Sequence, residues 1–90
     1  MEVDLIYVPG CPNVEMARAA LRAALPDGGW REWNLASEAT PERFRRFGSP
    51  TVLVDGRDVT GQEGGAAGMA CRADGAPPAH LIRDALAAGE

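Results

Sequence analysis

The feature that most constrains the fold is a change of hydrophobic pattern at Pro9-Gly10. Before it, Val3–Val8 is short, rich in β-branched residues and largely apolar, as expected of a buried strand. After it, apolar residues recur at helical spacing from Cys11 to Leu25. Pro12 falls in the first turn of that predicted helix, where proline is tolerated. A strand followed directly by a helix predicts a β-α unit that needs a further strand to complete it.

The rest of the chain supplies the remaining elements. Trp30–Leu35 reads as a second strand, with Trp33 and Leu35 on one face and Trp30 on the other. Thr40-Pro41-Glu42 predicts a helix start, and the short helix ends at Gly48. The third strand, the hairpin turn, the return strand and the last helix are expected at Thr51–Val54, Asp55-Gly56, Arg57–Thr60 and after Pro77-Pro78.

The predicted order is therefore β-α-β-α-β-β-α, an α/β fold. Two strands joined by a helix should be parallel, and the hairpin adds two antiparallel strands. We expect one domain over residues 1–90, with a mixed four-stranded sheet and helices on both faces. Residues 61–76 form a long Gly- and Ala-rich loop that contains Cys71, and long loops are often functional.

Composition excludes several classes of partner. Apolar residues make up 46% of the chain, which suits a globular core. The net charge of −4 argues against nucleic-acid binding, which needs a basic face. No apolar run approaches the ~20 residues of a membrane span, and the acidic N-terminus is unlike a signal peptide. We therefore expect a cytoplasmic protein without a membrane partner, and its oligomeric state is open.

Chemistry is expected to centre on the two cysteines, Cys11 and Cys71. Cys11 sits at the predicted start of a helix, where unsatisfied N–H groups and the positive dipole end favour the reactive thiolate. No basic side chain lies within four residues of Cys11, so activation would come mainly from the helix terminus. Tyr7 ends the first predicted strand, where its hydroxyl could reach the thiolate or a substrate. The simpler alternatives are a packed cysteine and a packed tyrosine.

Three features together make the chain resemble the thioredoxin/glutaredoxin superfamily. They are the element order, Gly10-Cys11-Pro12 at a helix start, and Ser49-Pro50-Thr51 before the third strand. The resemblance implies a cis peptide bond at Pro50 and a backbone edge at Ser49–Thr51 that binds an extended substrate. It also implies thiol–disulfide exchange by Cys11 as nucleophile, with no resident cofactor.

The chain departs from that family at Val14, where the usual second sulfur of the helix would lie. A monothiol reaction with a small glutathione-like thiol, or resolution by Cys71, would have to replace it. The arginine group Arg43, Arg45 and Arg46 is most simply a solvated helix face, and alternatively a site for such an anionic thiol.

A narrower resemblance is to small proteins grouped with alkylmercury lyases. It rests on Gly10-Cys11-Pro12, on the run from Ser49 to Gly56, and on Ala70-Cys71-Arg72. It implies a thiolate pair, Cys11 and Cys71, that binds an organomercurial or a soft metal ion such as Hg(II) or Cu(I). The aspartate of those lyases has no match, since Asn13 and Val14 occupy the nearby positions. A third alternative is a non-catalytic binding module.

Overall fold

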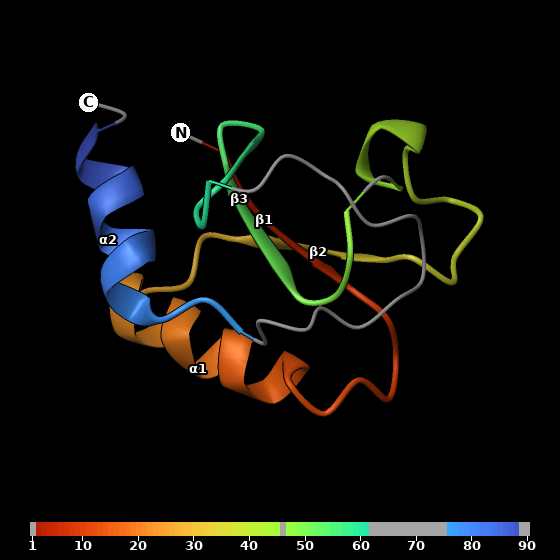
Figure 1. Ribbon diagram of the computed structural model, residues 1–90, viewed down its shortest axis with the longest axis horizontal. Coiled ribbons are helices and arrows are strands. Elements are labelled where there is room, and N and C mark those ends of the chain that lie inside the picture. Colours follow the sequence, from red (N-terminus) through yellow and green to blue (C-terminus); the bar gives the residue numbers. More distant parts are fainter. Residues whose placement is uncertain (1, 46, 62–75, 89–90) are drawn as a thin grey trace.

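The computed structural model describes residues 2–45, 47–61 and 76–88. They form an α/β fold with one mixed sheet of four strands in the order β2-β1-β3-β4. The strands are β1 (Val3–Tyr7), β2 (Arg31–Asn34), β3 (Thr51–Val54) and β4 (Arg57–Asp58). The helices are α1 (Val14–Ala24), α2 (Ala79–Ala88) and a 3-10 turn, η1 (Glu42–Phe44). Figure 1 shows α1 and α2 side by side, with η1 at the far end of the sheet.

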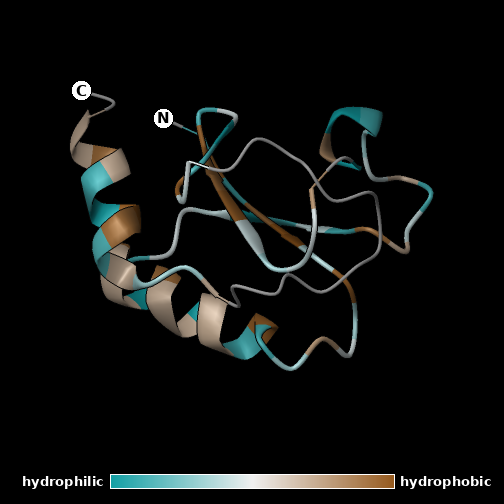
Figure 2. Cartoon of the chain, in the orientation of Figure 1, coloured by the Kyte–Doolittle hydropathy of each residue, from teal (hydrophilic) through white to brown (hydrophobic). Residues whose placement is uncertain are grey.

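Strand β1 lies at the centre of the sheet and is apolar on both faces except at Asp4. It pairs in parallel with β2, as the β-α-β unit predicts, and antiparallel with β3. The predicted hairpin pairs β3 antiparallel with β4. Strand β3 keeps its predicted bounds, and all four of its residues are buried. Figure 2 shows hydrophobic colour along β1 and β3, so the apolar core follows the two middle strands.

One face of the sheet is covered by both α-helices. Val3 and Leu5 of β1 contact the buried side of α1, where Ala17 and Leu21 lie, and Ile82 of α2 joins them. Ala17 and Leu21 lie one turn apart on α1, and Ile82, Ala85 and Leu86 lie about one turn apart on α2. The helical spacing of apolar residues in the sequence therefore placed these faces correctly.

The other face is covered without an α-helix in the described residues, which corrects the expectation of helices on both faces. Its core residues are Ile6, Leu35, Phe44, Phe47 and Leu53. Trp33 packs on this face whereas Trp30 packs on the first, as the alternation predicted. The covering segment runs from the end of β2 to Phe47, and η1 is its only helical part that the structure describes.

The helix predicted after Thr40 is reduced to η1 for two reasons. The cap position of η1 is taken by Pro41, with no side-chain capping bond, and the Thr40 hydroxyl donates to the Asn34 carbonyl. The Arg45 guanidinium also donates to the Leu35, Ser37 and Thr40 carbonyls, which fixes the preceding loop in a non-helical path.

The β3–β4 hairpin turns at Asp55-Gly56 as predicted. Both residues have positive φ, 51° and 83°, as the two-residue turn requires. Strand β4 is shorter than the predicted Arg57–Thr60. The Asp58 carboxylate accepts from the Thr60 N–H and hydroxyl at 2.9 and 2.8 Å, and this local turn ends the strand.

Within the described residues, no helix has the length and apolar character needed to cross a membrane.

Candidate functional site

Cys11 lies in a turn between β1 and α1. Gly10 has φ +84°, which a residue with a side chain rarely adopts, and the chain reverses there. The Cys11 N–H donates to the Val8 carbonyl, and the Cys11 carbonyl accepts from the Val14 N–H, both at 3.2 Å. Helix α1 begins at Val14 and not at Cys11. The cysteine therefore precedes the helix by three residues, a correction to the predicted helix start.

The Cys11 side chain faces the segment before β3. Its Sγ lies 3.7 Å from the Ser49 carbonyl oxygen, to which the thiol donates. A carbonyl can only accept, so this contact stabilises the neutral thiol, and the thiolate forms when that proton is lost. Cys11 is 8% exposed, and a reactant must therefore approach it through a defined opening.

Ser49, Pro50 and Thr51 lie behind Cys11 and are fully buried. The Ser49–Pro50 peptide bond is cis, as expected. The Ser49 hydroxyl accepts from the Val8 N–H at 2.9 Å, and the Thr51 hydroxyl donates to the Gly48 carbonyl at 2.8 Å. These bonds fix the segment against the end of β1. Substrate binding by the three residues stays a prediction, and the Ser49 carbonyl holds the Cys11 side chain.

A hollow of about 410 Å³ opens in front of Cys11. It is formed by the end of β1, the turn and the first two turns of α1, and its lining residues are Tyr7, Val8, Pro9, Gly10, Cys11, Pro12, Val14, Glu15 and Arg18. The volume is that of a small-molecule site. Of the residues proposed from the sequence, the structure brings Tyr7 and Cys11 together at this hollow.

Arg18 and Glu15 are the charged residues of this hollow, and the sequence analysis assigned neither of them to the site. The Arg18 Nε and Nη2 donate to both oxygens of Glu32 on β2, at 3.1 and 2.9 Å, and its Nη1 donates to Glu15 at 2.7 Å. The guanidinium also lies over the Tyr7 ring, 5.3 Å from the centroid. The one sequence signal for Arg18 was its place in the first turns of the predicted helix that follows Cys11.

The ion pair between Arg18 and Glu32 favours the charged form of both side chains. The hydrogen bond to Glu32, and next in size the hydrogen bond to Glu15, raise the pKa of Arg18 above its ordinary value. In return, the hydrogen bond from Arg18 lowers the pKa of Glu32, and the bond from the Trp30 indole acts in the same direction. A charged guanidinium therefore lines the hollow in front of Cys11, paired there with the Glu15 carboxylate.

The other predicted residues do not gather at this hollow. Cys71 and Arg46 lie outside the described residues, so the thiolate-pair hypotheses stay predictions. Arg45 is engaged by three loop carbonyls and by Glu42, and Arg43 lies over the Phe44 ring at 4.6 Å. These contacts give Arg45 a role in holding the loop, which corrects its expected place on a solvated face, whereas Arg43 is exposed as expected.

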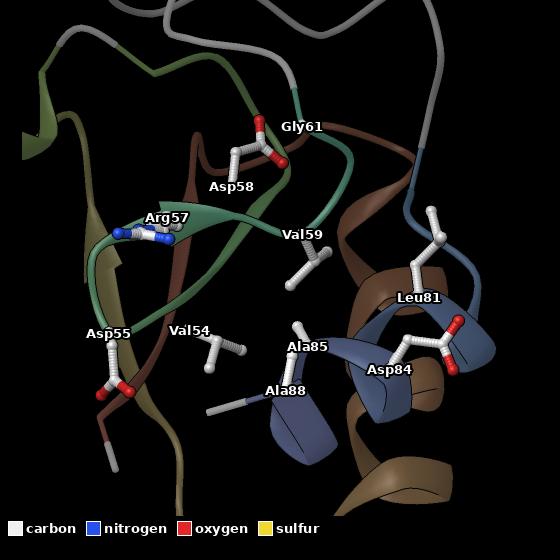
Figure 3. A pocket seen from close by; sticks show the side chains of 10 residues that line it. All are labelled: Val54, Asp55, Arg57, Asp58, Val59, Gly61, Leu81, Asp84, Ala85 and Ala88. Atoms are coloured by element: carbon white, nitrogen blue, oxygen red, sulfur yellow. The ribbon is translucent and has the colours of Figure 1, made fainter. Parts of the chain in front are cut away.

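A second hollow, of about 510 Å³, lies between the β3–β4 hairpin and α2 (Figure 3). Apolar side chains such as Val54, Val59 and Ala85 line its floor. Three carboxylates, of Asp55, Asp58 and Asp84, stand at its rim and point in different directions in Figure 3. Within the part of the chain described, no three His, Cys, Asp or Glu side chains form a group that could hold a metal ion.

Comparisons of the chain with protein-family models, with curated proteins and with solved structures find no match.

Proposed function

We propose that this chain is a thiol protein of thioredoxin-like fold in which Cys11 carries out thiol–disulfide exchange. The observation that carries the proposal is the position of Cys11, whose sulfur lies 3.7 Å from the Ser49 carbonyl at the floor of a 410 Å³ hollow. The mixed sheet, with β1 parallel to β2 and antiparallel to β3, supports the fold assignment. The reducing cytoplasm, the compartment expected from the sequence, suits such a thiol.

In the first step Cys11 loses its proton to solvent, and the thiolate attacks one sulfur of a substrate disulfide. A new S–S bond joins Cys11 to that sulfur while the original S–S bond breaks. The bonding electron pair leaves with the other substrate sulfur, which takes a proton from water. Cys11 is oxidised in this step, and the substrate disulfide is the oxidant.

In the second step a low-molecular-weight thiol reduces the mixed disulfide. Its thiolate attacks the substrate sulfur, the bond to Cys11 breaks, and Cys11 leaves as a thiolate. Val14 occupies the position of the second helix sulfur in related dithiol sites, so the external thiol supplies the second sulfur. Cys71 is the alternative source within the chain, as the sequence suggested.

The test is the rate at which Cys11 forms a mixed disulfide with neutral 2-hydroxyethyl disulfide, followed by mass spectrometry at neutral pH. The Ser49 carbonyl favours the neutral thiol, whereas the Arg18 charge at the hollow and the nearby start of α1 favour the thiolate. The proposal requires the second effect to dominate, and so we expect folded Cys11 to react faster than the same residue in the urea-unfolded chain, where the thiol pKa is near its ordinary value of about 8.5. Cys11→Ser should abolish the adduct at this position, and Cys71→Ser should preserve it. A folded rate no higher than the unfolded rate would contradict the proposal and favour a non-catalytic binding module.

A further inference from the structure

Two alanines of α2 leave a hollow between this helix and the β3–β4 hairpin, which we call the hairpin hollow. Ala85 and Ala88 lie one turn apart and face the hairpin, where Val54 and Val59 stand across from them (Figure 3). Because an alanine side chain is too short to fill the gap to the valines, a space of about 510 Å³ is left. That volume lies within the range of small-molecule sites.

The floor of the hairpin hollow is apolar and continuous with the core. Val54 is 5% exposed, and Val59 and Ala85 pack against the same buried cluster. An apolar group seated on these side chains would leave water and gain contacts with carbon, as the body of a ligand does in a binding pocket. The floor therefore favours a ligand with an apolar body.

The rim of the hairpin hollow is acidic. Among the described residues that line it, carboxylates outnumber guanidinium groups by three to one: Asp55, Asp58, Asp84 and Arg57. An excess of negative charge at the mouth of an apolar hollow attracts cations and disfavours the entry of anions. The rim therefore favours a positively charged ligand.

Asp84 is the carboxylate that is best placed to bind the cation. The Asp55 carboxylate accepts from the Glu2 N–H at 2.8 Å, and the Asp58 carboxylate accepts from the Thr60 N–H and hydroxyl. Asp84 forms no hydrogen bond or ion pair with any residue that the structure describes. Since its side chain is exposed, an ammonium group bound to it keeps part of its hydration, and neither charge is buried without a partner.

We infer that the hairpin hollow is a second binding site, for a small organic cation in which an ammonium group is joined to an apolar body. The apolar body lies on Val54, Val59 and Ala85, and the ammonium group donates to the Asp84 carboxylate. This site lies beside the start of β1, whereas Cys11 follows the end of that strand, and the two hollows share no lining residue. A ligand can therefore occupy it without touching the sulfur.

The test compares three probes that share a phenyl ring and a two-carbon spacer, on the full chain at neutral pH. They are 2-phenylethylamine, which is cationic, 2-phenylethanol, which is neutral, and 3-phenylpropionate, which is anionic. Dissociation constants are measured at low ionic strength, where charge effects are least screened, from the NMR shifts of the Val54, Val59 and Ala85 methyl groups. We expect the cationic probe to bind about three- to fivefold more tightly than the neutral one, and the anionic probe to bind most weakly.

Four variants locate the charge effect and the apolar contact. Asp84→Asn should weaken binding of the cationic probe about three- to fivefold and leave that of 2-phenylethanol unchanged. Arg57→Gln should strengthen binding of the cation about twofold, because it removes a competing positive charge from the rim. Glu38→Gln is the matched control, since it removes a negative charge at an exposed position outside the hollow. Ala88→Leu fills the space from an exposed helix position, where leucine suits the helix, and should weaken all three probes alike.

Three results would overturn the inference. The first is equal affinity for the cationic and neutral probes. The second is an equal effect of Asp84→Asn and Glu38→Gln on the cation, which would indicate general attraction to an acidic chain. The third is a shift of the methyl signals with protein concentration in the absence of a probe, which would place a second copy of the chain in the hollow. None of these measurements depends on thiol–disulfide exchange at Cys11, so this inference and the proposed function fail separately.

Discussion

Asp4 is an acidic residue in the middle of β1, on the face opposite the α-helices. It is 2% exposed, and one of its oxygens accepts from the Arg31 Nε at 3.0 Å and from the Trp33 indole at 2.9 Å. Arg31 in turn lies over the Trp33 ring at 5.5 Å. A buried carboxylate is tolerated in the sheet because both of these neighbours on β2 satisfy it.

We expect Asp4→Ala to lower the free energy of unfolding by about 2 kcal/mol, because the indole N–H and the guanidinium both lose their acceptor. Asp4→Asn keeps a neutral acceptor for the indole and should cost about half as much. Asp27→Ala, at an exposed position, is the control and should have little effect. Urea unfolding measures all three, and equal losses for Ala and Asn would show that the acceptor for Trp33 contributes nothing.

Among the elements, the β3–β4 hairpin depends most directly on backbone conformation. Gly56 has φ +83°, and a Cβ placed there would meet no atom within 4 Å. A substitution at this position is therefore opposed only by the left-handed backbone, and not by crowding. We expect Gly56→Ala to lower the free energy of unfolding by about 1 kcal/mol.

Gly56→Asn separates conformation from side-chain size in the same hairpin. Asn is larger than Ala yet adopts the left-handed region more readily, so it should cost less in the same urea titration. A greater loss for Asn than for Ala would mean that crowding limits this turn.

The elements that are specified by residues close together in the sequence could be predicted from it. Strand β3, the Asp55-Gly56 turn and the opposite faces of Trp30 and Trp33 follow from patterns within a few residues. The helix expected after Thr40 failed because Arg45 and the Thr40 hydroxyl bond to carbonyls earlier in the chain.

The candidate site, too, could be predicted only where its residues are marked by their near neighbours in the sequence. Cys11 could be recognised at a strand–helix junction, and its proximity to Ser49 came from a family resemblance. Arg18 could not be placed, because its partner Glu32 lies on β2, fourteen residues along the chain, and only the packed sheet brings them together.

At the scale of the whole molecule, α2 is joined to the sheet through one fully buried side chain in the described structure, that of Ile82. Ile82→Ala should lower the free energy of unfolding by about 3 kcal/mol, a large part of what a small domain has. Arg83→Ala, the exposed neighbour, should have little effect. An Ile82→Ala loss below about 1 kcal/mol in urea unfolding would mean that α2 contributes little to the core.

The placement of the two tryptophans on opposite faces of β2 has a further consequence. Trp30 packs beside the α-helices, whereas Trp33 contacts Phe44 in the other layer, with ring centroids 5.2 Å apart and the rings tilted by 34°. The sequence has two tryptophans, so each layer carries its own intrinsic fluorophore. Single-tryptophan versions of the chain would report the melting of each layer separately, and coincident transitions would identify the two layers as one cooperative unit.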